Sequence, residues 1–533
     1  MGGNTKTQIT VKKMIDFLSQ PFSYPHSPGD IAIIQTHASI LAIAPPFVYK
    51  VKKHINLGFL DFTTLEKRRN NCEREIRLNS RLCPYIYLDI VPISLKNDDL
   101  IFDDKGLVVD YAVKMKQLPG GYFLNQLLRE GKVTKNNFHP IVQCLKHFYK
   151  SQLPDETISA YGAIDKIRIN TDGNFKYMKE FIGHSIRKSA LDAIKFFTDD
   201  FYKRNSLLFE KRIKEYRIKD GHGDLRLEHI HLQGDKVCIY DCIEFNDRFR
   251  YIDMASDIAF LTMDIDFHHM PGLSVDVTKQ MISALDDKDM ALLMDFYKCY
   301  RACVRGKVES IKSLEPEIDS EEREESRLKA ERFFKLALQY AVCGSVPAVF
   351  VVSGRIGSGK STIAENMAEL LGWQYCSSDI TRKKEAGLSL QKRTPEEKRR
   401  GLYGKETTDG VYHYLLKTAV EKVQRGEGVV LDATFGSKDR REKFINAFEQ
   451  NNISYYFIEA WASDEIIKQR LFERDNKHVI SDARIEDFEL LSSNYNQPTE
   501  ISIRHLLKVN TELDIEDNLS NIFIKLIQLK EDN

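Results

Sequence analysis

The segment Gly354–Ser361 reads GRIGSGKS and follows the apolar run VPAVFVVS. The pattern G-x-x-x-x-G-K-S is typical of a phosphate-binding loop. Glycines let backbone N–H groups turn inward around a polyphosphate, the lysine reaches the β and γ oxygens, and the hydroxyl can bind Mg²⁺. This part of the chain is therefore expected to fold as a strand, a tight turn and a helix around a nucleoside triphosphate.

The residues of this loop are predicted to bind ATP. The helix-prone stretch TIAENMAELLG follows them, where a phosphate loop requires a helix. Ser361 is also the predicted hydroxyl ligand of Mg²⁺, and Lys360 is also expected to act in catalysis. The full predicted set is Gly354, Gly357, Ser358, Gly359, Lys360, Ser361 and Thr362.

Length, charge and cysteine content limit the remaining possibilities. A chain of 533 residues suits roughly two or three domains. Its 78 basic and 78 acidic residues balance, so a polyanion would have to bind in a local basic groove. No apolar run reaches membrane-spanning length, and we expect a cytoplasmic protein without membrane contact. The nine cysteines form no C-x-x-C pair, which favours reduced cysteines over disulfides or a zinc site.

The order of predicted elements divides the chain near Gly344. Short apolar runs over 30–53 predict an antiparallel sheet, followed by a helix over about 63–82 and two more strands. From Tyr122 the pattern is mainly helical, and after Gly344 strands alternate with helices, which predicts a parallel sheet. The expected domains are residues 1–343, with a small lobe at about 25–118 and a helical lobe at about 119–343, and residues 344–533.

Charged residues near the ends of the C-terminal strands extend the predicted nucleotide site. Ligands bind at the carboxyl ends of parallel strands, and Asp379, Arg382 and Asp432 follow or end such strands. We expect Asp379 to accept the proton of an acceptor hydroxyl, Arg382 to hold the acceptor and Asp432 to hold the metal's water shell. Arg470 and Arg474 share a helix face and could close over the triphosphate. The alternatives are helix-capping aspartates and solvated or salt-bridged arginines.

Together, G-x-x-x-x-G-K-S, D-x-x-R, a strand-end Asp and R-x-x-x-R resemble the P-loop kinase group of gluconate kinase, zeta toxin and polynucleotide 5′-hydroxyl kinase. This resemblance implies ATP-dependent transfer to a hydroxyl acceptor, with Asp379 as base, Arg382 on the acceptor, and Arg470 and Arg474 in a mobile lid. The D-x-x-R spacing most resembles polynucleotide kinase, although several small-molecule kinases fit nearly as well. The basic segment Arg382–Glu406 is either a substrate-covering insertion or a solvated loop.

A second candidate site lies in HGDLRLEHIHLQGDKVCIYDCIEF. Asp224 occupies its His-Gly-Asp turn, and Asp241 ends an apolar run shortly afterwards. Two carboxylates this close suit a catalytic loop in which the first orients an acceptor hydroxyl and the second binds Mg²⁺ bridging the nucleotide phosphates. The alternative is a hydrogen-bonded polar turn.

This stretch resembles the catalytic loop H-G-D-x-x-x-x-N of the aminoglycoside phosphotransferases, relatives of protein kinases. The resemblance spans about residues 25–310 and implies a protein-kinase-like α+β fold of two lobes. It implies that Asp224 is the catalytic base and that Asp241 binds metal. It also implies that Lys50 holds the α and β phosphates and is paired with Glu75.

Several positions leave this assignment open. Lys52 shares a strand face with Lys50, and Glu73 competes with Glu75. The expected nucleotide-covering loop, QTHASILAIA, contains no glycine, and His229 occupies the place of the family's metal-binding Asn. Imidazole is a poorer Mg²⁺ ligand than an oxygen, so metal binding is altered, shared or lost at this position. A zinc site is a further alternative, with the candidate ligands His222, His229 and His231.

The combination of an aminoglycoside-phosphotransferase-like part and a P-loop kinase part resembles bacterial proteins described as bifunctional aminoglycoside phosphotransferase/ATP-binding proteins. The leading hypothesis is an α/β multidomain enzyme with two ATP- and Mg²⁺-dependent phosphotransferase modules. The C-terminal module would act on a hydroxyl acceptor, either a polynucleotide 5′-hydroxyl or a small molecule. The competing hypothesis is a nucleotide-operated regulatory or binding protein with a degenerate N-terminal lobe. A third, aminoglycoside phosphorylation, requires an acidic cleft, for which the candidates are Asp264, Asp266, Asp286, Asp287 and Asp289.

Overall fold

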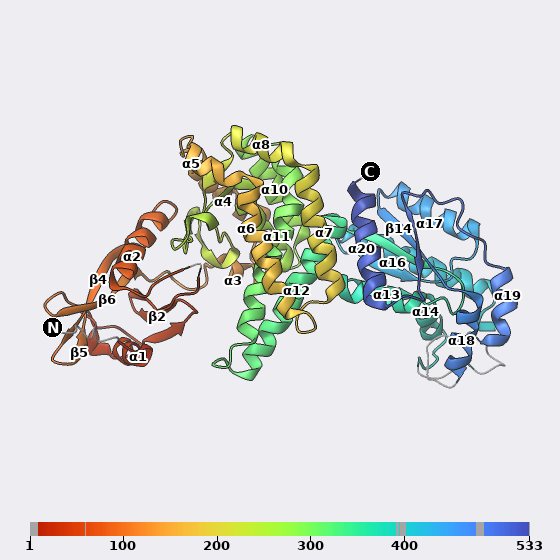
Figure 1. Cartoon of the computed structure of the whole chain (residues 1–533), viewed down its shortest axis with the longest axis horizontal. Helices are drawn as coiled ribbons and strands as arrows, with labels where there is room; N and C mark the ends of the chain where they lie inside the picture. Colours follow the sequence, from red (N-terminus) through yellow and green to blue (C-terminus); the bar gives the residue numbers. More distant parts are fainter. Residues whose placement is uncertain (1–8, 59, 391–393, 395–400, 476–483, 532–533) are drawn as a thin grey trace. The chain divides into compact units, whose positions relative to one another are not determined.

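The computed structural model divides into two compact units, each built from two stretches of the chain. The structure describes residues 9–58, 60–390, 394, 401–475 and 484–531. The first unit comprises Met1–Ile167 and Leu207–Met294, and the second comprises Arg168–Ser206 and Asp295–Asn533. Figure 1 labels the helices and strands of both units.

The first unit begins with a six-stranded antiparallel sheet in the order β1-β2-β3-β6-β4-β5. Helix α2 (Leu65–Asn79) packs on β4 and β6, and the Thr64 hydroxyl caps it by accepting the Lys67 N–H. The predicted antiparallel sheet and the predicted helix are therefore confirmed. The strands are β1 (Ala32–Gln35), β2 (Ser39–Ala44), β3 (Phe47–Lys52), β4 (Tyr87–Lys96), β5 (Asp99–Ile101) and β6 (Leu107–Lys116).

The remainder of the first unit is mainly helical, as the sequence predicts. Two short antiparallel ladders, β7 with β10 and β8 with β9, flank the segment between β7 and β8 that carries Asp224 and the segment between β9 and β10 that carries Asp241. These strands are β7 (Ile218–Asp220), β8 (Ile230–Gln233), β9 (Lys236–Ile239) and β10 (Tyr251–Asp253). The helices are α1 (Val11–Leu18), α3 (Leu124–Arg129), α4 (Phe138–Lys150), α5 (Glu156–Ser159), the start of α6 (Ile164–Met178), α8 (Ser206–Lys214), α9 (Met254–Phe267), α10 (Pro271–Leu285) and the start of α11 (Met290–Ser313).

Cys83 and Cys238 form a disulfide, although they are 155 residues apart in sequence. Both lie in a buried apolar cluster that also contains Cys72 and Val113. The prediction of reduced cysteines is wrong for this pair, because sequence spacing does not reveal which distant residues the sheet brings together. The other described cysteines are free.

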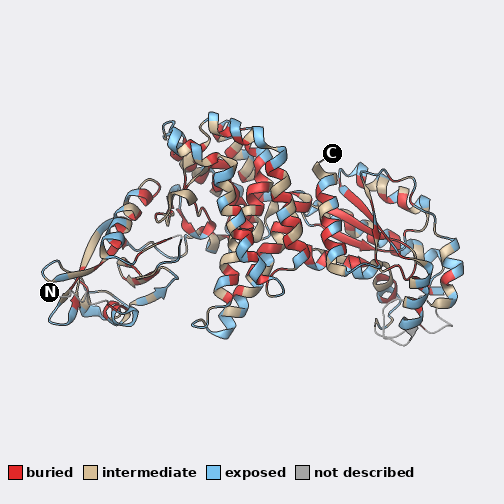
Figure 2. Ribbon diagram, in the orientation of Figure 1, coloured by how far each residue is buried: buried red, intermediate tan, exposed pale blue. Residues whose placement is uncertain are grey.

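The second unit contains a five-stranded parallel sheet in the order β12-β13-β11-β14-β15. Every residue of β11 is buried, as expected for a parallel strand covered on both faces. Figure 2 shows the central strands of this sheet as buried. The strands are β11 (Ala348–Ser353), β12 (Gln374–Ser377), β13 (Val429–Asp432), β14 (Ser454–Trp461) and β15 (Leu506–Asn510).

Helices α13 and α16 pack on this sheet, and a helix from the N-terminal half of the chain joins the same unit. Helix α7 packs against α12 and α20. Arg187, just before α7, donates hydrogen bonds to Glu516 and to Asn366, each at 2.6 Å. The helices are α7 (Lys188–Arg204), α12 (Ser320–Cys343), α13 (Lys360–Leu371), α14 (Ser378–Glu385), α16 (Lys405–Gln424), α17 (Lys438–Gln450), α18 (Asp464–Asp475), α19 (Phe488–Ser493) and α20 (Ile515–Glu531).

These elements confirm a mixed α/β protein with a parallel sheet behind the glycine-rich loop. Strands β11, β12 and β13 lie where the run VPAVFVVS and the strand-end positions Asp379 and Asp432 predict strands, whereas β15 was not predicted. Within the described ranges, the helices are too short or too polar to cross a membrane.

Candidate functional site

The glycine-rich loop connects the end of β11 to the start of α13. Gly354, Gly357 and Gly359 have φ values of 142°, 70° and 91°, which side chains rarely permit. A Cβ atom at Gly359 would lie 3.1 Å from the Thr511 side chain. Lys360 donates a hydrogen bond from Nζ to the Arg355 carbonyl at 2.9 Å. The predicted loop therefore has the tight backbone that a phosphate cradle needs.

Thr511, directly after β15, holds an arginine against this loop. Its hydroxyl donates to the Ser358 carbonyl at 2.6 Å and accepts from Arg470 Nη1 at 2.9 Å. Arg470 also donates to the Thr511 carbonyl at 2.7 Å. Arg470 thus lies beside the loop, while the Arg474 side chain lies outside the part of α18 whose side chains are described. Thr511 was missed because its partner is 153 residues away in sequence.

Asp432 ends β13 and lies among hydroxyl groups at the carboxyl edge of the sheet. Its carboxylate accepts a 2.6 Å hydrogen bond from the Tyr375 hydroxyl. Burial raises the pKa of Asp432, opposed by the Lys360 ammonium and by the Tyr375 and Ser361 hydroxyls. Oxygen donors from Ser361 and Asp432 fit the preference of Mg²⁺ for carboxylate, hydroxyl and water ligands.

Tyr375 was not predicted as a site residue, and the structure gives it a measurable role. Because its hydroxyl orients the Asp432 carboxylate, replacement by phenylalanine is expected to weaken Mg²⁺-dependent ADP binding about threefold to tenfold. Calorimetric titration of ADP with and without Mg²⁺ would measure this. Equal losses in both conditions would contradict the role in holding Asp432.

Asp379 and Arg382 form an ion pair in the first turns of α14. Arg382 Nη1 donates to Asp379 Oδ1 at 2.9 Å, and the Arg382 guanidinium lies 4.5 Å from the Tyr403 ring centroid. The Asp379 side chain is 28% exposed and that of Arg382 only 7%. Ser377, two residues before Asp379, pairs in register with Asp432 between β12 and β13, so the two carboxylates share one edge of the sheet.

In the first unit, two strand lysines surround one buried glutamate. Lys50 Nζ lies 2.8 Å from Glu75 Oε1 and donates to Asp241 Oδ1 at 2.7 Å. Lys52 Nζ donates to Glu75 Oε2 at 2.5 Å and also to Glu244. Burial lowers the pKa of Lys50, but these carboxylates raise it well above its ordinary value. Lys50 is therefore the lysine that joins Glu75 to Asp241.

The predicted rival Glu73 has a different environment. Its side chain is 51% exposed and pairs with Arg69 at 3.1 Å on the outer face of α2. By contrast, Glu75 is fully buried. The helix therefore presents Glu75 rather than Glu73 to the two lysines, which follows from the angular spacing of neighbouring helix positions.

Asp224 is engaged by a residue that sequence reasoning missed. Arg226 donates two hydrogen bonds to its carboxylate, both at 2.9 Å, and pairs with Glu228 as well. His229 lies 3.6 Å from Asp241 Oδ2, and its Nδ1 hydrogen-bonds the Asp224 carbonyl at 2.9 Å. Arg226 has no motif of its own, but its position two residues after Asp224 was a visible signal.

The histidines of this loop bind backbone carbonyls rather than gathering as metal ligands. His222 Nε2 contacts the Tyr240 carbonyl at 3.0 Å, and His231 Nε2 contacts the Pro119 carbonyl at 3.0 Å. In the part of the chain that is described, no cluster of three metal-binding side chains occurs. This geometry does not support the zinc alternative.

His222 provides a pH-dependent prediction. Burial lowers the pKa of its imidazole to about 4, against about 6.5 in an unfolded chain. The unfolded state therefore binds the proton more tightly, and stability present above pH 6.5 is lost as the pH falls toward 4. We expect a loss of about 1.5 kcal/mol between about pH 6.5 and pH 5. Thermal unfolding across this range should show a weaker pH dependence for His222→Gln, and an unchanged one for the exposed His139→Gln.

Among the comparisons with known proteins, one family model covers the glycine-rich loop. Residues 349–498 match the family described as AAA domain. The uncharacterized protein Rv2004c of Mycobacterium tuberculosis (strain ATCC 25618 / H37Rv) is 30% identical over 411 residues, 77% of this chain and 80% of the relative. A gluconokinase structure from Sinorhizobium meliloti 1021 is 18% identical and covers 35% of this chain and 95% of its own, with a TM-score of 0.25. A putative kinase from Chloroflexus aurantiacus j-10-fl is 20% identical and covers 33% and 97%, with a TM-score of 0.27.

Proposed function

This chain belongs to the same family as the uncharacterized mycobacterial protein Rv2004c, and we propose that it is an ATP-dependent phosphotransferase whose second unit phosphorylates a hydroxyl group. The observation that carries the proposal is the shared edge of the parallel sheet. There Asp379, paired with Arg382, lies two residues after Ser377, which is the register partner of Asp432 on the neighbouring strand β13. A nucleotide switch alone needs no such second carboxylate beside its phosphate loop.

The proposed reaction uses each of these groups once. The hydroxyl oxygen of the acceptor bonds to the γ-phosphorus while Asp379 takes the hydroxyl proton. At the same time the bond from that phosphorus to the β–γ bridging oxygen breaks. Lys360 stabilises the charge that develops on the phosphates, and Arg470 lies beside the loop for the same task. Bound Mg²⁺ would neutralise phosphate charge, and Ser361 and Asp432 would hold it.

The acceptor is proposed as an alcohol bearing a polar or anionic group. Arg382 supports this, because its guanidinium is largely buried and its Nε has no hydrogen-bond partner within the described residues. A buried donor without a partner is suited to a ligand atom. A polynucleotide 5′-hydroxyl end and a phosphorylated small molecule both meet this requirement. Much of the predicted covering segment Arg382–Glu406 lies outside the described residues.

We further propose that residues 1–343 form a second, protein-kinase-like module and residues 344–533 the P-loop module. Support for the site in residues 1–343 comes from the contacts that link Glu75 to Lys50 and Lys50 to Asp241. Asp224 would be its base, Asp241 would hold Mg²⁺, and His229 lies beside both. The carboxylate oxygens suit Mg²⁺, whereas the imidazole of His229 is a poor ligand for it.

A regulatory role for the first unit is the second candidate, and one observation favours it. Both oxygens of Asp224 accept hydrogen bonds from Arg226, and Asp241 is paired with Lys50. Carboxylates held in this way must exchange partners before they act as base or metal ligand. Such a unit could bind nucleotide or a partner without transferring a phosphoryl group.

Labelled ATP distinguishes these functions. The full-length protein is incubated with γ-labelled ATP and 5′-hydroxyl oligonucleotides, nucleosides, sugars or aminoglycosides, in parallel with Lys360→Ala and Asp224→Ala. For the second unit, the proposal expects labelling of an acceptor that Lys360→Ala removes and Asp224→Ala leaves unchanged. Loss only with Asp224→Ala would assign the activity to the first unit. ATP hydrolysis without labelling of any acceptor would favour the regulatory alternative.

A further inference from the structure

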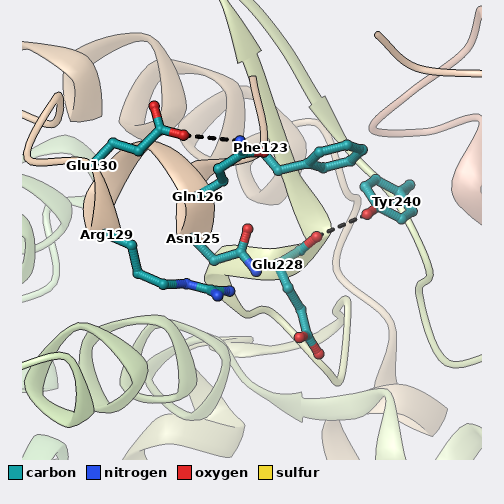
Figure 3. Close-up of a pocket in the computed structure, with 7 residues that line it drawn as sticks. All are labelled: Phe123, Asn125, Gln126, Arg129, Glu130, Glu228 and Tyr240. Atoms are coloured by element: carbon teal, nitrogen blue, oxygen red, sulfur yellow. Dashed lines mark hydrogen bonds between the residues drawn. The ribbon is translucent and has the colours of Figure 1, made fainter. Parts of the chain in front are cut away.

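A polar cavity of about 600 Å³ opens beside the catalytic loop of the first unit. Figure 3 shows the side chains of Asn125 and Arg129, from α3, directed toward Glu228 of the loop. Phe123 and Tyr240 provide aromatic surface on another side, with ring centroids 6.3 Å apart. A cavity of this size accommodates a small organic molecule.

The charged side chains that line the cavity differ in whether they form ion pairs within the protein. The Glu228 carboxylate pairs with Arg226, and that of Glu130 pairs with Lys132 at 2.6 Å. Arg129 is exposed, and its guanidinium has neither an ion pair nor a hydrogen bond within the described ranges. Within the described residues, Arg129 is therefore the charged group of the lining that remains available to a ligand.

The cavity also lies next to the two carboxylates of the proposed second site. Arg226 contacts both Glu228, which lines the cavity, and Asp224. Tyr240, which also lines it, directly precedes Asp241 and donates its hydroxyl to the Glu228 carbonyl at 2.8 Å. A molecule in the cavity would therefore be adjacent to the proposed base.

Polycation binding has less support in this unit. Of the five aspartates considered for an acidic cleft, Asp264 accepts the Leu227 N–H at 2.9 Å, and Asp287 pairs with Arg212 in the interior. Asp289 pairs with Lys211 at 2.6 Å. Three of the five carboxylates are thus already engaged within the first unit.

We propose that this cavity binds a small organic anion, a carboxylate or phosphate, through Arg129 and the Asn125 amide, with its apolar part against Phe123 and Tyr240. Arginine recognises both kinds of anion through paired N–H donors. This anion would also be the phosphoryl acceptor of the first unit. That role rests on the proposed protein-kinase-like module of residues 1–343. The cavity would then select against polycationic antibiotics.

A charge series on one scaffold tests the proposal in the full-length protein. Para-hydroxymethylbenzoate, neutral para-bis(hydroxymethyl)benzene and cationic para-aminomethylbenzyl alcohol share a ring and a hydroxyl. We expect the carboxylate to bind about tenfold more tightly than the neutral compound, and the cation to bind most weakly. Arg129→Gln should remove the preference, while the control Arg77→Gln, an exposed arginine of α2 outside the cavity, should keep it.

Titration calorimetry measures these affinities without requiring phosphoryl transfer. A negative binding result is therefore separate from a lack of phosphotransferase activity in residues 1–343. Unchanged thermal unfolding of Arg129→Gln would show that the variant is folded. Three results would overturn the proposal: tightest binding of the cation, a charge preference that survives Arg129→Gln, or no binding of the carboxylate at millimolar concentration. Carboxylate and phosphate sources are then compared by competition with glycerate and glycerol phosphate.

Discussion

Replacing Asp379 with asparagine is expected to lower kcat for acceptor phosphorylation by about 10²–10⁴-fold. Asparagine has nearly the same shape, and its amide oxygen can still accept the 2.9 Å hydrogen bond from Arg382. It cannot take a proton from the acceptor hydroxyl. ATP affinity, measured by calorimetry, should therefore change little while transfer of the labelled γ-phosphoryl group collapses.

A matched control lies on the same helix. Glu385, at the exposed end of α14, should tolerate replacement by glutamine with almost full activity. If Asp379→Asn retained more than about a tenth of the wild-type kcat, a role as general base would be wrong. An increase in KM with unchanged kcat would instead indicate that Asp379 only positions the acceptor.

Removing Arg212 should produce the largest loss of stability in the first unit. Its guanidinium is fully buried and binds Asp253 through two hydrogen bonds of 2.8 and 2.6 Å, as well as Asp287. Arg212→Ala would leave two buried carboxylates without their cation, which costs about 3–5 kcal/mol. The free energy of opening of α9, obtained from amide hydrogen exchange, measures this loss.

The neighbouring lysine provides the comparison. Lys211 pairs with Asp289 at 2.6 Å, but its side chain is 52% exposed. Lys211→Ala should therefore change the opening of α9 very little, because water replaces the lost partner. Similar effects of the two substitutions would show that burial does not determine the contribution of Arg212.

The glycine-rich loop and the strands around it could be predicted because their signals are local. An apolar run, a glycine pattern and a helix-prone stretch are adjacent in sequence, and β11 and α13 follow from them. Strand-end positions likewise suggested Asp379 and Asp432, since parallel strands end at one edge of a sheet. For the loop, β11 and α13, one short segment contained the whole pattern, whereas the roles of Asp379 and Asp432 remain predictions.

Long-range contacts could not be predicted in the same way. Tyr375 contacts Asp432 across 57 residues, and Arg187 contacts Glu516 across 329. Helix α7 has ordinary amphipathic spacing, which shows that it is buried on one face but not which helices cover that face. The Cys83–Cys238 disulfide was missed for the same reason. These features depend on how separate segments meet rather than on the residues of either segment.

The triphosphate is expected to bind at the glycine-rich loop of the second unit. A crystal structure of the full-length protein with Mg²⁺ and a non-hydrolysable ATP analogue tests it most directly. We expect the γ-phosphate within hydrogen-bonding distance of Lys360 Nζ, with the Asp379 carboxylate facing the side of the γ-phosphorus opposite the bridging oxygen. An analogue bound away from the glycine-rich loop, or Asp379 turned away from the γ-phosphate, would contradict it.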